Sequence, residues 1–400
     1  MERIAVVYDV GAATPTEILG SLDGLAEPVF VLPDSEQGSE LAELISDFAA
    51  VTTFDTVLDH RPRGVLTFSD YQLEPAANLA ERLGVPFHSP EAALNITRKF
   101  RQRSILNERG VDPTPTTLLT SLAAAAAVAG QIPLPAVLKP NRGFGGTNTY
   151  LVESTEELLT LAERLFGAEE VAPDDGYVAE GLIAGVDVAP PWGNYVSVES
   201  MVRGGEISHI GITGKLALTP PFREQGSYLP ARTDAFDADA VLALTTNALT
   251  ALGVGDSICH TEVKLTPDGP RIIEVNGRLG HPIYDLFKRA HRVDLIRVAA
   301  QLALGERPAI RLHPSRDVVY HYFGLPPVGA WKLSEISGLG QLRARGEVEQ
   351  VSLLIKPPSS LDWRRGFQER IYTCIGRTDN HAALADFASR IDDILGIRYL

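Results

Sequence analysis

The residues with the clearest chemical potential lie in one short stretch of the chain. Two runs rich in β-branched residues, Thr261–Leu265 and Arg271–Val275, flank a Pro-Asp-Gly-Pro sequence, and this pattern predicts a β-hairpin. Pairing that is symmetric about the aspartate of the turn places Glu262 directly opposite Glu274. Opposed Cβ atoms of antiparallel strands lie about 5 Å apart, so these two like charges repel each other.

Further polar side chains share the face of this hairpin that carries the two glutamates. Side chains alternate between the faces of a strand, so Asn276 and Arg278 project on the same side as Glu274. Carboxylate and amide oxygens suit a hard divalent cation, and the guanidinium would lie beside an anion bound to that cation. The hairpin therefore predicts a metal–phosphate site. The alternative is an ordinary solvated strand face with two solubilising glutamates.

A second motif joins an apolar strand to a lysine and a glycine-rich loop. Pro135–Leu138 leads into Lys139, and the next strand-like run is Thr149–Val152, so the arrangement is not a P-loop, in which a helix would follow. Glycines let backbone N–H groups wrap phosphate oxygens, and a lysine adds a point charge. The motif predicts a phosphate-binding loop, and the alternative is a glycine turn beside an exposed lysine. The loop glycines are Gly143, Gly145 and Gly146.

A third element, the segment 177–185, reads as a strand that leads into a bend. The strand ends in Glu180 and Gly181, which could present backbone groups and one carboxylate to the edge of an adenine ring. An ordinary strand end is the alternative interpretation.

Composition narrows the class of protein. A length of 400 residues predicts two or three domains, and 44% hydrophobic with 22% charged residues is typical of a globular protein. The net charge of −15 argues against a nucleic-acid partner. The two cysteines, Cys259 and Cys374, show no metal-ligand spacing and suit a reducing compartment. No signal sequence and no apolar run of membrane-spanning length is evident, so we expect a soluble cytoplasmic protein without a membrane partner.

The first ninety residues alternate short apolar strands with helices, which predicts a parallel sheet in an α/β layer. No G-x-G-x-x-G sequence is present there, so a nicotinamide cofactor is disfavoured. The expected strands are Ile4–Tyr8, Val29–Leu32, Val65–Phe68 and Val85–Phe87, and the expected helices are Leu41–Ala50 and Pro75–Leu83.

The rest of the chain shows helix signals, one linker and a mixed C-terminal part. Ser89 followed by Pro90 and Glu91 favours a helix start. A stiff linker at 112–116 indicates a domain boundary. The remaining expected elements are helices at Lys99–Arg109, Ala123–Ala127 and Asn380–Leu395, and a strand at Val351–Leu354.

Taken in order, the helix with Lys99, the lysine–glycine loop, the Glu-Gly-Leu-Ile bend and the acidic hairpin resemble the ATP-grasp superfamily, over about residues 1 to 305. The segments Gly211–Leu216 and Pro220–Pro230 are similar to those of carboxylate–amine ligases that join amino acids. The resemblance implies an ATP-grasp fold of mixed α/β and α+β class. It implies an N-terminal parallel-sheet domain (1–112), a lid domain (113–184) and a catalytic antiparallel-sheet domain (185–305). Residues 306–400 match the family poorly, and the helical pattern Asn380–Leu395 with the strand-like Val351–Leu354 predicts a C-terminal α+β lobe packed on the catalytic domain.

The resemblance also implies roles for residues that would bind the nucleotide and its metal. Lys99 and Lys139 would bind the α and β phosphates, under the glycine loop. Glu180 and the backbone of Ile183 would meet the adenine. The ribose would be held by Asp187 or Glu199, depending on whether 188–194 is an insertion. The implied ligands of one or two Mg²⁺ (or Mn²⁺) ions are Glu262, Glu274 and Asn276.

On the substrate side, Arg278 would stabilise charge on the transferred phosphoryl group and Glu224 would receive a substrate ammonium group. Lys215 and Ser227 would lie beside the substrate. The chain departs from the family at Gly181 and Gly214, where relatives often carry glutamate, and at Ser227, where amino-acid ligases commonly carry histidine. The nearby Trp192 could line an acceptor pocket or pack in the core.

The expected activity is ATP-dependent amide or peptide bond formation between a small carboxylate and a small amine, through an acyl phosphate, with release of ADP and phosphate. The alternatives are a biotin-carboxylase-like carboxylating enzyme and a nucleotide-binding subunit without turnover. The expected partners are the two small-molecule substrates and, as one option, a second copy of the chain in a homodimer.

Overall fold

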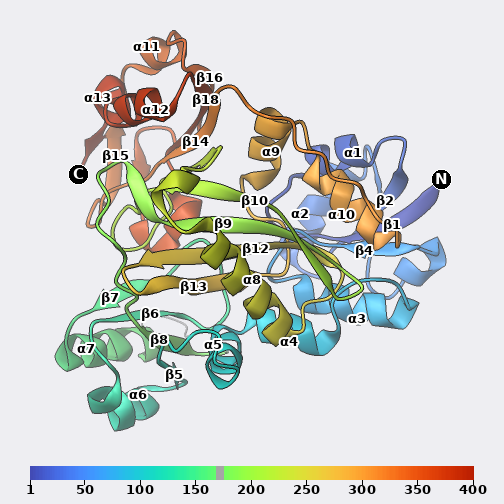
Figure 1. Cartoon of the computed structure of the whole chain (residues 1–400), viewed down its shortest axis with the longest axis horizontal. Helices are drawn as coiled ribbons and strands as arrows, with labels where there is room; N and C mark the ends of the chain where they lie inside the picture. Colours follow the sequence, from blue (N-terminus) through green and yellow to red (C-terminus); the bar gives the residue numbers. More distant parts are fainter. Residues whose placement is uncertain (168–174) are drawn as a thin grey trace.

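The computed structural model describes residues 1–167 and 175–400, whose strands form four sheets (Figure 1). In Figure 1 the N-terminal sheet lies at the right, a small sheet with α6 and α7 lies at the lower left, and the largest sheet lies between them. None of the helices in the described ranges is long and apolar enough to cross a membrane.

The N-terminal sheet has the strand order β3-β2-β1-β4, and all of its pairs are parallel, as the alternation of strands and helices predicts. Apolar residues of β1 point alternately into separate cores on the two faces of the sheet. Its elements are β1 Glu2–Val7, α1 Pro15–Leu22, β2 Ala26–Val31, α2 Glu36–Ile45, β3 Ala50–Thr52, β4 Gly64–Leu66 and α3 Leu73–Leu83.

Two expectations for this region are wrong. The helix expected at Leu41–Ala50 runs over Glu36–Ile45, because the Ser35 hydroxyl caps its first turn, and Ala50 already begins β3. The segment 85–87 forms no strand. It follows the left-handed Gly84 that ends α3, and Pro86 has no N–H to donate to a neighbouring strand.

Two helices connect this sheet to the lid sheet. Ser89 caps α4 (Pro90–Thr97) as expected, by accepting a hydrogen bond from the Ala92 N–H at 3.1 Å. Helix α5 (Lys99–Glu108) begins at Lys99, whose backbone N–H donates to the carbonyl of Asn141. The first turn of α5 is therefore held against the start of the glycine loop.

The lid sheet is antiparallel, with the order β5-β8-β6-β7. Its core includes residues of α6 and α7, and the expected alanine-rich helix is α6. Part of the predicted lid segment, residues 168–174, lies outside the described residues. The elements are β5 Thr116–Leu119, α6 Leu122–Val128, β6 Ala136–Pro140, β7 Tyr150–Val152, α7 Thr155–Phe166 and β8 Tyr177–Gly181.

The largest sheet has eight antiparallel strands in the order β13-β12-β9-β10-β11-β14-β18-β16. Helix α8 covers one face through a core that includes valines of β9, β12 and β13. Helices α9 and α10 join this sheet to the N-terminal sheet through a shared core. The elements up to residue 305 are β9 Trp192–Arg203, β10 Glu206–Leu216, β11 Gly226–Leu229, α8 Ala238–Leu252, β12 Ser257–Thr266, β13 Gly269–Asn276, α9 Ile283–His291 and α10 Leu295–Ala303.

Residues after 305 do not form a lobe that only packs beside the catalytic sheet. Three of their strands, β14, β18 and β16, continue the eight-stranded sheet edge to edge from β11, which corrects that expectation. The expected helix Asn380–Leu395 is two helices. The bounds of the four expected domains stay predictions. The C-terminal elements are β14 Val318–Gly324, β15 Lys332–Glu335, α11 Leu339–Arg343, β16 Val348–Leu353, β17 Ser359–Ser360, a 3₁₀ helix Trp363–Glu369, β18 Tyr372–Thr378, α12 His381–Ala388, α13 Ile391–Leu395 and β19 Arg398–Tyr399.

Candidate active site

The acidic hairpin forms and opposes the two predicted glutamates, but its strands do not pair symmetrically about Asp268. Thr266 lies opposite Gly269 at the turn, and a bulge between Glu262 and Val263 restores the predicted pair. Glu262 of β12 lies opposite Glu274 of β13, with a register shift directly after this pair. On its other side Glu262 lies opposite Ser197 of β9, which in turn lies opposite Thr213 of β10. A row of polar side chains therefore crosses the sheet on the face turned away from α8.

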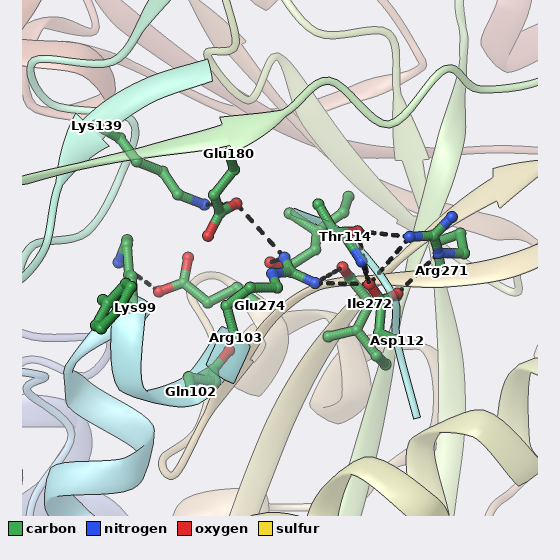
Figure 2. A network of polar contacts seen from close by, with 12 residues as sticks. Lys99, Gln102, Arg103, Asp112, Thr114, Lys139, Glu180, Arg271, Ile272 and Glu274 are labelled. Atoms are coloured by element: carbon green, nitrogen blue, oxygen red, sulfur yellow. Dashed lines mark hydrogen bonds and ion pairs between the residues drawn. The ribbon is translucent and has the colours of Figure 1, made fainter. Parts of the chain in front are cut away.

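Lys99 contacts both this hairpin and the glycine loop. Its Nζ lies 2.6 Å from Oε1 of Glu274 and donates to the carbonyl of Gly143 at 2.7 Å (Figure 2). Burial lowers the pKa of Lys99, but the adjacent Glu274 carboxylate outweighs burial and the net shift is upward. Lys99 is thus a buried cation between the backbone of the glycine loop and Glu274, a candidate metal ligand.

Lysine Lys139 points from β6 toward Glu180 of β8, with 2.9 Å between its Nζ and Oε2 of the carboxylate. Arg103 approaches the same carboxylate oxygen at 3.5 Å. Burial raises the pKa of Glu180, but these two cations outweigh burial and hold it below the usual range. Glu180, near the end of β8, is therefore held as a carboxylate by its cationic neighbours.

Sequence reasoning missed the network that supports this pair. Figure 2 shows Arg103 bridging Glu180 and the fully buried Asp112, and Asp112 also pairs with Arg271 at 3.0 Å. The Arg103 guanidinium donates to the carbonyls of Ile272 and Ile273, so α5 is held against the acidic hairpin. The available signal was spacing: Lys99 and Arg103 are four residues apart and share a helix face.

A cavity of about 190 Å³ lies between the lid sheet and the large sheet. Most residues predicted to bind nucleotide or metal line it together, although they come from α5, β6, β8, β12, β13 and the loops between them. The predicted residues that line the cavity are Lys99, Lys139, Gly143, Gly145, Gly146, Glu180, Ile183, Glu224, Glu262 and Glu274.

Neither residue expected at the ribose lines this cavity. Asp187 is exposed, and Glu199 is fully buried in the sheet, where it accepts a hydrogen bond from Ser197. The cavity lining does include Lys264, whose Nζ donates to the side-chain oxygen of Asn194 at 2.6 Å. Sequence reasoning did not select this amide–amine pair.

Glu199 contacts the acidic hairpin through a histidine. His260 Nδ1 lies 3.0 Å from both Glu199 carboxylate oxygens, and its Nε2 lies 3.5 Å from Glu262. Burial lowers the pKa of His260, but Glu199 outweighs it and the pKa is about 9. Burial raises the pKa of Glu262, but His260, Lys215 and Arg278 bring it to about 2. Glu262 is accordingly a fixed anion.

The predicted substrate residues form a cluster beside this row. The Lys215 ammonium and the Ser227 hydroxyl both donate to Oε1 of Glu224, at 2.7 and 2.6 Å. Burial lowers the pKa of Lys215, but Glu224 and Glu262 outweigh burial and raise it. Glu224 therefore already has a cationic partner, and it also lines the cavity.

Arg278 follows the hairpin and links it to the N-terminal sheet. Its guanidinium pairs with Asp70 and also donates to the side-chain oxygen of Asn276 at 3.4 Å. Burial lowers the pKa of Arg278, but Asp70 outweighs burial and raises it. Neither Arg278 nor Asn276 lines the 190 Å³ cavity, although both share the polar face of the hairpin.

The donor set on this hairpin fits a hard divalent cation. Glu262 and Glu274 offer two carboxylates across one strand pair, and Asn276 adds an amide oxygen two residues farther along β13. Among the described residues, no three histidine, cysteine or acidic side chains gather closely enough to enclose a metal by themselves. Phosphate oxygens would therefore have to complete the shell of an ion held here.

Trp192 opens β9 and packs among aromatic side chains. Its ring lies 5.0 Å from that of Tyr228 and 5.9 Å from that of His381, with the Arg232 guanidinium over it at 4.9 Å. It lines a second cavity, of about 300 Å³, which shares Tyr195 with the first. Trp192 therefore packs against other rings and also lines a cavity, and a role of that cavity in binding the acceptor stays a prediction.

No family model matches the chain. The uncharacterized protein y4rH of Sinorhizobium fredii is 27% identical over 310 residues, which are 77% of this chain and 62% of that protein. Human carnosine synthase 1 is 26% identical over 273 residues, 63% of this chain and 32% of that protein. The L-arginine-specific L-amino acid ligase of Bacillus subtilis is 22% identical over 366 residues, 88% of this chain and 82% of that protein. The chain thus spans less than two thirds of the first two relatives.

Solved structures show the same architecture. An L-amino acid ligase from Bacillus licheniformis superposes with a TM-score of 0.77 at 20% identity, over 100% of this chain and 99% of that chain. A carboxyaminoimidazole ribonucleotide synthase from Aspergillus clavatus, complexed with ATP, superposes with a TM-score of 0.71 at 14% identity, over 98% of each chain.

The fold of this chain is the ATP-grasp fold, as its motifs predicted. Within that class the chain resembles carboxylate–amine ligases, since its relatives of named activity include amino-acid ligases and carnosine synthase.

Proposed function

We propose that this protein is an ATP-dependent ligase that joins a small carboxylate to the amino group of an amino acid or similar amine. The reaction would pass through an acyl phosphate and release ADP and phosphate. The relatives that support the proposal are named as a carnosine synthase and as an L-arginine-specific L-amino acid ligase. Solved structures of the same fold include one complexed with ATP and one with ADP and magnesium.

One observation carries the proposal: a single sheet face places candidate phosphate, metal and substrate groups in sequence. Lys99 reaches Glu274 at one edge, and Glu262 lies opposite it. Lys215 follows on β10, two strands farther across the sheet, and pairs with Glu224 in the loop before β11. A nucleotide between lid and sheet would direct its terminal phosphate toward the substrate groups. This geometry suits positioning and charge stabilisation, which are the main tasks of a phosphoryl-transfer site.

We assign the first step to the hairpin and the two lysines. A carboxylate oxygen of the substrate attacks the γ-phosphorus of ATP, the bond to the β-phosphate oxygen breaks, and ADP leaves. Lys99 and Lys139 would bind phosphate oxygens, and Arg278 would stabilise charge on the transferred group. Glu262, Glu274 and Asn276 would hold Mg²⁺ or Mn²⁺, which when bound supplies positive charge to the phosphates.

The second step forms the amide. The neutral amine attacks the acyl carbon, the bond from that carbon to the phosphate oxygen breaks, phosphate leaves with the electron pair, and the nitrogen releases one proton to the departing phosphate or to water. Glu224 would orient the incoming amino group, with Lys215 and Ser227 holding the carboxylate of Glu224 in place. The glycine loop would exclude water, because water would hydrolyse the acyl phosphate.

The proposal is tested by ADP release with pairs of amino acids and amines, and by mass spectrometry of the product. We expect ADP release that requires both a carboxylate and an amine, with an amide product of the summed mass less water. ADP release that ignores every amine and responds to bicarbonate would contradict the ligase assignment.

Replacing Lys139 by Ala should weaken ATP binding by about ten- to a hundred-fold, because one charge-assisted hydrogen bond contributes about 1.5–3 kcal/mol. Calorimetry with ATP measures the loss. The matched control is Lys332→Ala on β15, which lies outside the cavity lining and should leave ATP affinity unchanged. Equal ATP affinity in the two variants would place the nucleotide elsewhere.

A further inference from the structure

A C-terminal segment, the 3₁₀ helix Trp363–Glu369, lies directly on the glycine loop. The Phe367 N–H donates to the carbonyl of Gly145 at 2.7 Å, and the Asn148 N–H donates to the carbonyl of Arg364 at 2.7 Å. A Cβ on Gly366 would lie 2.3 Å from the Gly145 oxygen, so only glycine permits this approach. This segment is therefore part of the wall around the phosphate loop.

Aromatic contacts connect this segment to the substrate side of the sheet. The Phe367 ring lies 4.8 Å from that of Phe323 and 5.2 Å from that of His281. Phe323 is two residues beyond His321 on β14, and His321 lies opposite Ser227 of β11. Phe323 therefore shares the face that carries Ser227, and Phe367 covers that face from above.

Arg370 extends from the end of this segment without a carboxylate to neutralise it. Its guanidinium lies over the Phe367 ring at 4.1 Å, and its Nη1 donates to the carbonyl of Phe367 at 3.0 Å. Its Nε is buried and makes no hydrogen bond, and no acidic side chain of the described ranges forms an ion pair with it. Burial alone lowers the pKa of Arg370.

Most other cations of the site differ in this respect. Lys99, Lys215 and Arg278 each pair with an acidic side chain. The buried Arg223 also lacks a carboxylate, but three of its nitrogens donate to the carbonyls of Pro220 and Pro326. Lys264 of the cavity lining has no carboxylate either and donates to Asn194. Arg370 likewise lacks a carboxylate, and its Nε in addition makes no hydrogen bond, which is costly for a partly buried charge.

Arg370 is one of several basic groups around the buried His281. Burial and repulsion from Arg370, His321, Lys215 and Arg278 together lower the pKa of His281 to about 3. Lys215, Arg278 and His321 each lie against a carboxylate, of Glu224, Asp70 and Asp285 respectively. Arg370 has no such partner among the described residues, so it is the charge there that a bound anion would neutralise.

We propose that Arg370 is a specificity-determining residue that binds the carboxylate which stays free in the product. This inference rests on the proposed ligase function and names one substrate feature: the second, unactivated carboxylate. Such a group comes either from the acceptor, as the α-carboxylate of an amino acid, or from the side chain of an acidic donor. A guanidinium binds a carboxylate through two parallel hydrogen bonds, which a neutral amide cannot reproduce.

The test compares substrates matched in shape but not in charge. Each acceptor amino acid is paired with its amide, and glutamate is paired with glutamine as donor, with kcat/KM measured from ADP release and product mass. The variants are Arg370→Gln, Arg370→Lys and the control Arg365→Gln, whose exposed side chain leaves the same 3₁₀ helix toward Glu369.

We expect wild type to prefer the charged member of one pair at least tenfold. Arg370→Gln should reduce that ratio to about twofold, Arg370→Lys should give an intermediate ratio, and Arg365→Gln should keep the wild-type ratio. Whether the acceptor or the donor pair responds identifies the source of the carboxylate. If Arg370→Gln fails to fold, the Arg370→Lys variant is the test: a reduced ratio supports the inference and a wild-type ratio contradicts it.

Equal kcat/KM for both members of every pair in wild type would overturn the inference while leaving the ligase function intact. An unchanged ratio in both Arg370 variants would do the same. Failure of wild type to release ADP with any substrate pair would instead overturn the proposed function.

Discussion

Glu274→Gln is expected to reduce Mg²⁺-dependent ADP formation by about a hundred-fold or more, while the protein stays folded. The substitution removes one negative charge from a pair of opposed carboxylates, and a hard cation binds through such charges. A glutamine keeps the side-chain oxygen that accepts from Lys99 at 2.6 Å, so the contact with α5 is preserved. The measurement is ADP formation across a range of Mg²⁺ concentrations, with thermal unfolding as the check on folding.

The matched control is Glu335→Gln on β15, which replaces an exposed glutamate paired with Arg398 and should leave turnover unchanged. A partial recovery of Glu274→Gln at high Mg²⁺ would indicate weakened cation binding, as the metal assignment predicts. Turnover near the wild-type value at low Mg²⁺ would show that Glu274 holds no catalytic cation.

Asp112→Asn is expected to destabilise the protein by about 3–5 kcal/mol, the usual cost of removing one partner from a buried ion pair. Asp112 is fully buried and accepts hydrogen bonds from Arg103, Arg271 and the N–H of Ile272. The variant leaves the Arg103 guanidinium in the protein interior without its nearest carboxylate. Denaturant unfolding at neutral pH measures the loss, and the exposed Asp268→Asn at the turn of the same hairpin is the control.

The same carboxylate predicts a pH dependence of stability. Burial raises the pKa of Asp112, but Arg271, Arg103 and Thr114 outweigh it and bring the pKa from 3.8 to about 2. A depressed folded pKa stabilises the folded state above the unfolded pKa, and this contribution disappears as the pH falls through the folded value. About 2 kcal/mol should therefore be lost between about pH 4 and pH 2. If wild type and Asp112→Asn lose stability equally over this window, Asp112 is not the group responsible.

Much of the fold could be predicted because its signals are local. Hydrophobic alternation and caps located the parallel sheet and most helices, and a lysine followed by closely spaced glycines located the glycine loop. Wrong expectations arose where a cap began a helix early, as at Ser35, or where a proline stood in an expected strand, as at Pro86. The edge-to-edge addition of β14, β18 and β16 was not predictable in this way. Strand order depends on which edges meet in three dimensions, and side-chain alternation within one strand carries no information about its neighbour.

The candidate site also combines features that the local sequence predicts with contacts that it does not predict. The sequence by itself determined that the two acidic strands form one hairpin, because a short turn pairs the strands that flank it. The register at the turn, with Thr266 opposite Gly269, would set Glu262 against Ile273, and the bulge after Glu262 brings it opposite Glu274. Only the tertiary structure decided that Lys99 reaches Glu274, that Glu199 lies against His260 instead of in the cavity, and that Phe367 covers Gly145. These contacts join residues 61 to 222 positions apart, and nothing in the local chain constrains their approach. Packing of the shared cores brings them together, so their partners follow from the folded arrangement and not from spacing along the chain.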